Sequence, residues 1–465
     1  MANKNTAEIS HSKMNMASYG FGKFVIEMLE MAFTALGFFF YENEVGLNVW
    51  LVALGYICYA LWNAINDPMV GYLTNRPFKF TKKWGRRFPL IIIGGILTVL
   101  SYFLVFMPPR VDPVSGAWII FAWLVFSTCL FDTFNSIFFV NFVSLFPDKF
   151  RSVEERRTAT GIGTIVGIFG VAIGAIIPPL LYTFGDLDSY IIQAGALVLI
   201  GLIAMVFLIP GSREDQETID KYLQTHQDKT ERESFFGTLK NVMKQKSFVV
   251  FIITYMLYRG LTISMTASIP FVIKYVLELP AEAATLIFVG LLLGALVSIP
   301  LWVLFAIKSN NNKKTMALAC IALTLSTIPL IFINTYFWMI IAIFIWGFAL
   351  GGFWAMLALV FSDVIDESVG KTGKREEGIF NGFQQFFGRM GIILQATSFA
   401  LMHSMTGFVP GATTQSPEAV WGIIMHFALI PMIFMLIGTI IFIIWYDLTP
   451  EKVTSNQQKI KEMGL

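Results

Sequence analysis

The stretch WNAINDPMVGYLTNRPFKFTKKWGRRFP, residues Trp62–Pro89, decides the fold. Its first third ends a long apolar run that nevertheless contains an acid, Asp67, followed at once by Pro68. Proline removes a helical hydrogen bond and disfavours helix in the residue before it, so we expect a helix break there. An acid inside a membrane-spanning segment is costly unless it has a partner or a task. The last third is a basic loop, which predicts the side of the membrane that the stretch faces.

The composition of the whole chain agrees with a membrane setting. The chain has 465 residues, of which 56% are hydrophobic and only 14% charged, and its mean hydropathy is +0.68. Soluble domains are about 25% charged. Apolar runs of about 20 residues recur along the chain, which predicts an all-α polytopic membrane protein. The first eighteen residues are polar and show no cleavage pattern, so we expect no removable signal peptide.

The apolar runs predict twelve membrane-spanning helices. The expected spans are 19–41, 47–75, 88–108, 116–146, 157–183, 189–210, 247–276, 283–306, 315–334, 337–362, 376–404 and 418–446. Lysines and arginines concentrate in the termini and in the loops after even-numbered spans, whereas the other loops offer little beyond Arg110 and Lys274. This bias predicts an even number of spans in the cell membrane, with both termini in the cytoplasm.

A polar interruption divides the spans into two sets of six. We expect an N-terminal six-helix half over 1–210, a cytoplasmic linker over 211–246, a C-terminal half over 247–446 and a cytoplasmic tail over 447–465. Six plus six spans is the plan of the major facilitators, whose halves rock around a central site. Span five carries five glycines between Gly161 and Gly174, which we interpret as a surface for close helix packing.

Several function classes find no support in the sequence. The short loops leave no room for a soluble catalytic domain, and neither a phosphate-binding Gly-rich motif nor a His/Asp metal cluster is visible, so we expect no enzyme and no catalytic residue. Cys58, Cys129 and Cys320 lie in apolar runs and are interpreted as packing residues. The expected partners are a small-molecule substrate and membrane lipids, with no nucleic acid and no cofactor, and we expect a monomer.

Charged residues at membrane depth are the candidate functional groups. Lys23, Glu27 and Glu30 are spaced so that they share one face of the first span. In the second span Asn63 and Asp67 are four residues apart and offer oxygen ligands, which suits a hard cation such as sodium. Asp67 could instead carry a proton, or form a structural salt bridge with Arg389. Asp132 and Arg259 are further charges within spans, for which structural and functional roles are both open.

The eleventh span has the composition of a polar cavity wall. Arg389 lies well inside it, and amide side chains stand on the neighbouring turns; these are Asn381, Gln384, Gln385 and Gln395. The four histidines, by contrast, have no acid neighbours within a span, so we do not expect a proton relay through them.

Four short stretches carry a resemblance to a known family. They are YGFG at Tyr19–Gly22, the stretch WNAINDPMVG with WGRRFP between Trp62 and Pro89, DVIDESVGKTGKREEGIFNGFQQ at Asp363–Gln385, and YDLTPEKV at Tyr446–Val453. With these the chain resembles the glycoside–pentoside–hexuronide:cation symporters, the melibiose-permease-like branch of the major facilitators. The stretches cover both halves, so the resemblance is full-length.

The resemblance implies roles for individual residues. Asp67 matches the retained acid of the family's cation site, and Asn63 stands where that site usually has a second acid. This departure removes a charge, so proton coupling or weakened coupling is as open as sodium coupling. Glu27 falls at a sugar-binding acid, and Arg389 falls at the basic residue thought to link the cation and sugar sites. Gly163 falls where melibiose-type members have an arginine, which argues against a galactoside.

We therefore expect a secondary active transporter that couples a cation to a small polar solute, a sugar or glycoside, by alternating access. Relatives of the family also move lipid-like amphiphiles, which is the alternative. Cation uptake at Asp67 and Asn63 would weaken the attraction of Asp67 to Arg389 and let substrate bind. The expected substrate contacts are Glu27, Lys23, Glu30, Arg389, Gln385 and Trp62. The expected coupling and gating residues are Arg259, Asp363, Asp366, Arg86 and Arg87.

Overall fold

The structure of the chain is a computed structural model that describes residues 11–74, 81–216, 219, 242–373 and 377–463. Helices dominate these residues, and no strand occurs among them. The chain divides into two compact units, Met1–Thr230 and Glu231–Leu465. Most of the expected linker, 211–246, and the first ten residues lie outside the described part.

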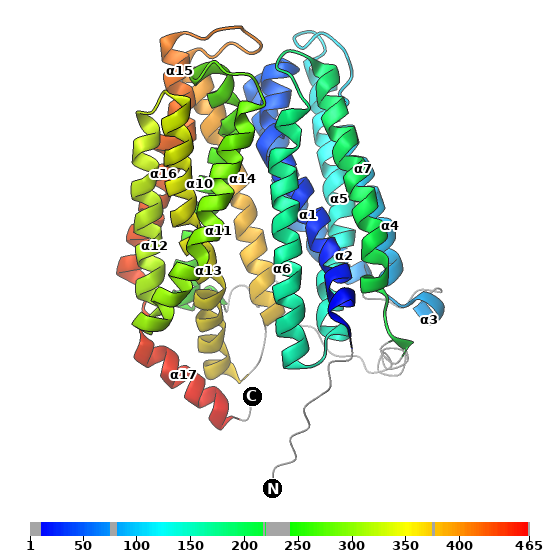
Figure 1. The fold of residues 1–465 in the computed structure, drawn as a ribbon, viewed down its shortest axis with the longest axis vertical. Coiled ribbons are helices and arrows are strands. Elements are labelled where there is room, and N and C mark those ends of the chain that lie inside the picture. Colours follow the sequence, from blue (N-terminus) through cyan, green and yellow to red (C-terminus); the bar gives the residue numbers. More distant parts are fainter. Residues whose placement is uncertain (1–10, 75–80, 217–218, 220–241, 374–376, 464–465) are drawn as a thin grey trace. The chain divides into compact units, whose positions relative to one another are not determined.

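The first unit consists of long helices joined by short connections (Figure 1). The elements are α1 (Lys13–Phe39) with the π-helical turn η1 (Phe40–Glu44), α2 (Val49–Thr74), α3 (Thr81–Trp84), α4 (Phe88–Val105), α5 (Ala117–Lys149), α6 (Val153–Ile176) with the 3₁₀ turn η2 (Pro178–Leu180), and α7 (Leu187–Ser212).

The second unit is built on the same plan. Its elements are α10 (Lys246–Phe271) with the π-helical turn η3 (Val272–Val276), α11 (Ala283–Ser309), α12 (Asn312–Thr327) with the 3₁₀ turn η4 (Ile328–Ile331), α13 (Tyr336–Thr372), α14 (Glu377–Thr406), α15 (Pro417–Ile424), the π-helical turn η5 (Met425–Leu429), α16 (Ile430–Trp445) and α17 (Pro450–Glu462).

The helices confirm the predicted all-α membrane fold. Within the described residues, 11 helical segments are long and apolar enough to cross a membrane. The remaining predicted span coincides with α14, which is 30 residues long but carries Arg389 and several amides, so its hydropathy is lower. The α15–η5–α16 segment forms one continuous span from Pro417 to Trp445. The protein is thus a multi-pass membrane protein.

Two sequence expectations about helix ends are wrong. The α2 helix continues through Pro68 to Thr74, so the expected break does not occur. A membrane helix tolerates proline because its neighbours and local adjustments satisfy the freed carbonyl. The tenth span does not stop near residue 362, because α13 extends to Thr372 and its last turns are held by the ion pair Lys371–Glu367, four residues apart. The tail also contains a helix that was not predicted, α17, which packs on α13.

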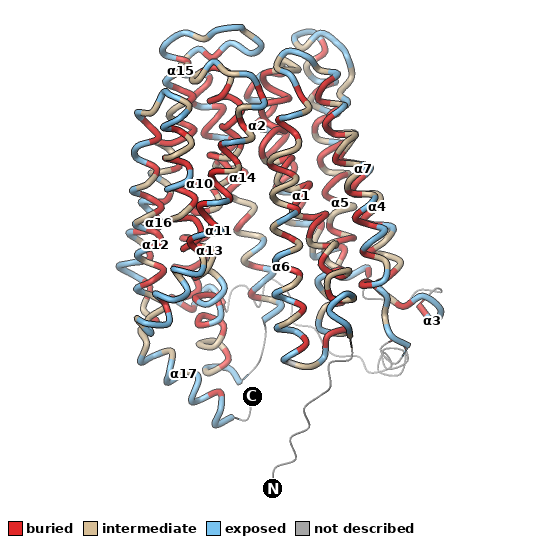
Figure 2. Tube along the Cα trace, in the orientation of Figure 1, coloured by how far each residue is buried: buried red, intermediate tan, exposed pale blue. Residues whose placement is uncertain are grey.

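The first helix of each unit lies at the centre of that unit. The apolar windows of α1 and α10 are 78% and 72% buried, the two highest values among the spanning segments of the described chain. Figure 2 shows buried segments recurring along α1. In the first unit α1 packs on α6 and α7, and in the second α10 packs on α14 and α16.

The glycines of span five confirm the packing interpretation for α6. A methyl group on Gly170 would overlap the backbone of Phe24 on α1, and one on Gly174 would overlap the backbone of Met28. The two helices therefore touch along their backbones, which only glycine permits.

The two units share a feature of backbone geometry. Each first helix ends in a π-helical turn, in which Val45 N–H donates to Phe40 C=O at 2.9 Å and Leu277 N–H donates to Val272 C=O at 2.9 Å. The next turn repeats the match, since Leu47 donates to Tyr41 and Leu279 donates to Ile273. When these turns are aligned in sequence, Arg259 of α10 falls at the position of Glu27 of α1.

Candidate functional site

A cluster of polar side chains lies between α2 and α5 in the first unit. Asn63, Asn66 and Asp67 share one face of α2 because they are three and four residues apart. Asp132 and Ser136 share one face of α5 for the same reason, and the two helices pack together. Four of these residues are buried: Asn63, Asn66, Asp132 and Ser136 are each at most 2% exposed. We call these five residues the α2–α5 polar cluster.

Hydrogen bonds join the two carboxylates of the cluster through neutral side chains. Asn63 Nδ2 donates to Asp132 Oδ1. Asn66 Nδ2 donates to Asp132 Oδ2 at 3.2 Å and to Ser136 Oγ at 2.9 Å. Ser136 Oγ in turn donates to Asp67 Oδ1. Asp67 and Asp132 are therefore linked through a single serine and a single amide.

The cluster offers oxygen atoms for a cation. Asn66 Oδ1 is buried and has no hydrogen-bond partner among the described residues, which is costly for a carbonyl oxygen. Carboxylate, amide and hydroxyl oxygens are the ligands that hard cations prefer. Asn66 Oδ1 and the oxygens of Asp67, Asp132 and Ser136 form a suitable donor set. A proton shared between the carboxylates would satisfy the same chemistry.

The structure gives Asn63 a different role from the one that the sequence predicted. The sequence predicted a site that lacks one of two acids because Asn63 is neutral. In the structure Asn63 is a donor to Asp132, so a second carboxylate comes from α5. Asn66 and Ser136 were missed; their spacing to Asn63 and Asp132 is compatible with a shared face but does not by itself indicate a bond to another helix.

Trp62, an expected substrate contact, lies beside the cluster and is half-buried. Its indole N–H donates to Thr133 Oγ1 at 3.0 Å. The ring is thereby fixed against α5, and its role toward substrate stays a prediction.

The expected face of α1 exists. Lys23, Glu27 and Glu30 are half-buried, whereas most of their neighbours on the helix are buried. The aliphatic part of Lys23 lies against Gly167 of α6. This line of charges of both signs is the polar face of an otherwise buried helix.

The candidate residues of the second unit lie on two adjacent helices. Gly391 of α14 lies against the backbone of Arg259 on α10. Arg259 and Arg389 are half-buried, and Gln385 is exposed. Arg389 and Asp67 belong to different units, and their attraction stays a prediction.

The expected gating arginines are held within the first unit. Arg87 Nε donates to Asp148 Oδ2 at 3.1 Å, and Arg86 Nη2 lies 3.6 Å from the same oxygen. The carboxylate of Glu214 accepts from the backbone N–H groups of Arg87 at 2.7 Å and Phe88 at 3.1 Å, so it caps the start of α4. Burial raises the pKa of Glu214, and these N–H groups offset part of that effect.

The acidic part of the expected gate lies at the end of α13. Asp363 is buried and accepts from Asn312 Nδ2 at 2.9 Å. Nearby Glu367 accepts from Gln245 Nε2 at 2.9 Å and from the hydroxyl of Ser247. Asp366 is half-buried. These bonds lie inside the second unit, and the gating role of the residues stays a prediction.

Two histidines that the sequence analysis set aside lie together. His403 Nε2 and His426 Nε2 are 2.9 Å apart and buried. Ser268 Oγ donates to Ser264 C=O, so it accepts from His426 Nδ1, and His403 is then the donor between the rings. His426 sits in the π-helical turn η5. No sequence pattern indicates this pair, because its members lie on different elements.

Residues 18–450 match the family described as MFS/sugar transport protein. The chain belongs to this family. Its members are transporters, so the cluster and the charged faces described above belong to a transport protein, not to an enzyme.

Other similarities support the same fold. The chain is 24% identical to the sodium-dependent lysophosphatidylcholine symporter 1-B of Danio rerio, over 86% of this chain and 80% of that one. It is 22% identical to an uncharacterized symporter of Bacillus subtilis, over 97% and 95%. The crystal structure of the nucleoside transporter NupG matches with a TM-score of 0.58 at 13% identity, over 96% of this chain and 99% of that one.

Proposed function

We propose that this transporter is a symporter that couples a cation to an organic solute. The α2–α5 polar cluster carries the proposal. Two neighbouring carboxylates repel each other, and a bound cation or proton offsets that repulsion. Cation binding therefore favours the arrangement in which α2 and α5 bring the carboxylates together. Coupling follows if the solute favours the same arrangement, since ligands shift a conformational equilibrium only by their differential affinity.

Sodium is the coupling ion that we propose. The cluster offers oxygen ligands of three kinds, including the amide oxygen of Asn66, which a proton would not need. The relatives named sodium-dependent symporters support this choice. A proton held between Asp67 and Asp132 is the alternative, and it predicts a response to a pH gradient instead of a sodium gradient.

For the solute we favour an amphiphile with a small zwitterionic headgroup. Relatives named lysophosphatidylcholine symporters support this class. The half-buried Glu27 on α1 also fits it, because its carboxylate would contact the ammonium group of such a headgroup.

A sugar or glycoside is the second candidate. The family description includes sugar transport. Glu27 and Glu30 could accept hydrogen bonds from hydroxyl groups, as the resemblance to the melibiose-permease-like branch implies. Arg389 and Gln385 would complete such a site. Arg389 would link it to the cation, because cation binding at Asp67 would weaken the attraction of Asp67 to Arg389.

Uptake into proteoliposomes tests the proposal. Lysophosphatidylcholine and a panel of sugars are offered under an inward sodium gradient, an inward proton gradient, or neither. We expect sodium to stimulate uptake, and Asp67→Asn and Asp132→Asn each to abolish the stimulation. Glu154→Gln, on the exposed first turn of α6, is the control and should leave it intact. Full sodium stimulation in both aspartate variants would refute the coupling role of the cluster.

A further inference from the structure

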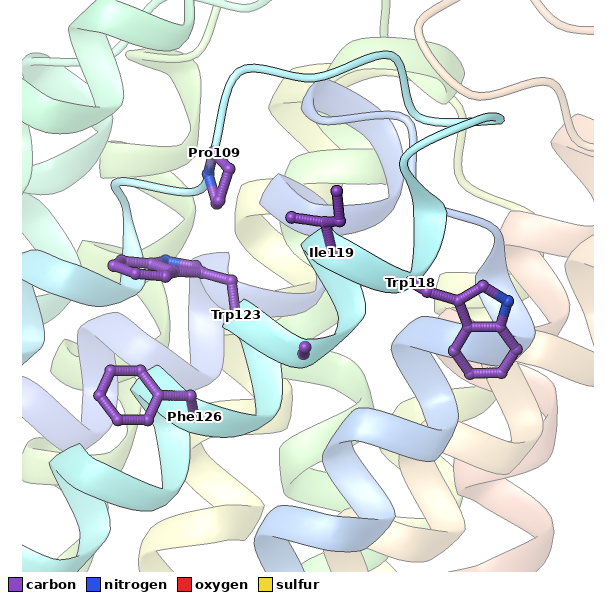
Figure 3. Close-up of a pocket in the computed structure, with 6 residues that line it drawn as sticks. Pro109, Trp118, Ile119, Trp123 and Phe126 are labelled. Carbon is purple, nitrogen blue, oxygen red and sulfur yellow. The ribbon is translucent and has the colours of Figure 1, made fainter.

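An apolar groove lies on the exposed face of α5, close to the start of that helix. Its volume is about 450 Å³, and it is lined by Pro109, Trp118, Ile119, Ala122, Trp123 and Phe126. Ala122 leaves a gap between larger neighbours on the helix surface. In Figure 3 the ring of Trp123 lies between Pro109 and Phe126, and Trp118 projects from the other side of α5.

The groove is suited to a hydrocarbon chain. Trp118, Ile119 and Phe126 are more than half exposed, at 68%, 55% and 54%. The indole N–H of Trp123 already donates to Leu104 C=O at 3.1 Å, so it needs no acceptor from a ligand. The α5 helix crosses the membrane, so the exposed face near its start contacts lipid. An acyl chain is the occupant that this environment supplies.

An ion pair adjoins the lining residue Pro109. Arg110 follows Pro109 directly and pairs with Asp188 in the first turn of α7. The side chains of the pair are 65% and 66% exposed. Exposed ion pairs contribute little to stability, so this one opens easily. A zwitterionic headgroup complements both partners, because its phosphate suits the guanidinium and its ammonium group suits the carboxylate.

We propose that the groove is a binding site for a zwitterionic phospholipid. One acyl chain lies over Ala122, against Trp123 and Phe126, and the headgroup lies at Arg110 and Asp188. The groove lies where α4 ends and α5 begins, whereas the basic residues that precede Phe88 lie at the other end of α4. The lipid therefore belongs to the leaflet on the side of the membrane opposite the basic loop. This site serves a resident lipid and does not depend on which solute the protein carries.

Quenching of tryptophan fluorescence by brominated lipid tests the site. The full-length protein in detergent is titrated with phosphatidylcholine whose acyl chains carry bromine. We expect saturable quenching, with a component that Trp123→Phe removes. The chain has 11 tryptophans, so this variant identifies the part of the signal that comes from the groove.

Filling the groove should block the lipid. Ala122→Phe should weaken the saturable quenching at least fivefold, whereas Val206→Phe, which adds the same ring on the exposed face of α7, should leave it unchanged. Arg110→Gln should weaken binding of brominated phosphatidylcholine several-fold without altering the fold, because the side chain is exposed. Quenching that rises linearly without saturation, or that is equal in Ala122→Phe and Val206→Phe, would overturn the proposal.

Discussion

The carboxylate of Asp132 is buried in the first unit, where charge is tolerated only with hydrogen-bond donors around it. Asn63 and Asn66 supply those donors from α2. Each amide also brings an oxygen, so the donors that stabilise the acid bring cation ligands with them. The neutral residue at position 63 is therefore compatible with the cation site that we propose. Its N–H groups hold Asp132, a carboxylate from α5.

Ser136→Ala tests how the two carboxylates communicate. Ser136 donates to Asp67 and accepts from Asn66, so its removal leaves a carboxylate and an amide each short of one bond. A hydrogen bond to a charged group is worth about 1.5–3 kcal/mol, so we expect sodium affinity to fall about tenfold or more. The increase in the melting temperature of the purified protein with sodium concentration measures this affinity.

Ser127→Ala is the matched control for this variant. Ser127 is also buried on α5, but its hydroxyl donates to Leu124 C=O of its own helix. The control should retain the sodium response. An unchanged response in Ser136→Ala as well would contradict the role of the serine.

Glu214, which lies outside the membrane-spanning helices, makes the stability of the folded protein depend on pH. Its pKa is raised in the folded protein because it is buried, so the folded state holds the proton more tightly than the unfolded state. The stabilising contribution is present below the ordinary glutamate pKa and is lost as the pH rises from there through the raised pKa.

Glu214→Gln keeps an oxygen for the N–H groups of Arg87 and Phe88 but cannot ionise. The melting temperature of this variant relative to the native protein should therefore increase as the pH is raised from the ordinary glutamate pKa upward through the raised pKa of Glu214. Thermal unfolding in detergent at several pH values measures it, with the exposed Glu154→Gln as control. A difference between variant and native protein that stays constant with pH would contradict the argument.

The cluster was only partly predictable from the sequence. An aspartate in an apolar run is conspicuous, so Asp67 and Asp132 were visible. Small polar residues in membrane helices are not, because most bond to a carbonyl one turn earlier; Thr98 and Thr128 do so here. Nothing in the sequence separates those residues from Ser136, which bonds across to another helix.

At the scale of the element, helix contacts are decided by the smallest residues. The α6 helix approaches α1 so closely that Gly170 lies against the carbonyl of Phe24. Sequence patterns predicted this packing well, because glycines four apart are conspicuous in a span. They predicted helix ends less well, since proline removes a helical hydrogen bond but need not end a membrane helix whose surroundings satisfy the freed carbonyl, as at Pro68.

Gly170→Ala should destabilise the first unit. The added methyl group would meet the backbone of Phe24, which cannot rotate away, so α1 and α6 must separate. We expect a loss of about 1–3 kcal/mol from overpacking, seen as a lower melting temperature.

Gly161→Ala, on the same helix, is the control. A methyl group there meets nothing within 4 Å, and alanine favours helix over glycine by about 1 kcal/mol. This variant should be as stable as the native protein or slightly more stable. Equal destabilisation by both variants would show that helix packing at Gly170 is not the cause.

At the scale of the whole molecule, the similarity between the two units is clearer in the backbone hydrogen bonds than in the amino-acid sequence. The sequence shows little similarity between the two sets of six spans, whereas α1 and α10 end in π-helical turns with matching hydrogen bonds. The backbone bonds depend on geometry and not on side-chain identity, so they survive when side chains diverge. The divergence is then informative, because the same position holds an acid in α1 and a base in α10.

The number and direction of the spans can be tested with two cysteines. Val114 lies in the loop before α5, after three of the predicted spans, and Ser455 lies on α17, after all twelve predicted spans; both are exposed. The bias of basic residues predicts that the N-terminus lies in the cytoplasm. Val114→Cys should therefore react with an impermeant maleimide in intact cells, and Ser455→Cys only after permeabilisation.

The native cysteines will contribute little to this signal, because Cys320 is buried and Cys58 and Cys129 are half-buried within spans. Nine predicted spans separate the two engineered positions, so reaction of both cysteines from the same side would mean that an even number of them crosses the membrane. The predicted span that does not cross would then be α14, because its polar residues exclude it from the helices that are apolar enough to cross a membrane. Because α14 carries Arg389, that result would also remove the arginine from the membrane depth that its proposed role requires.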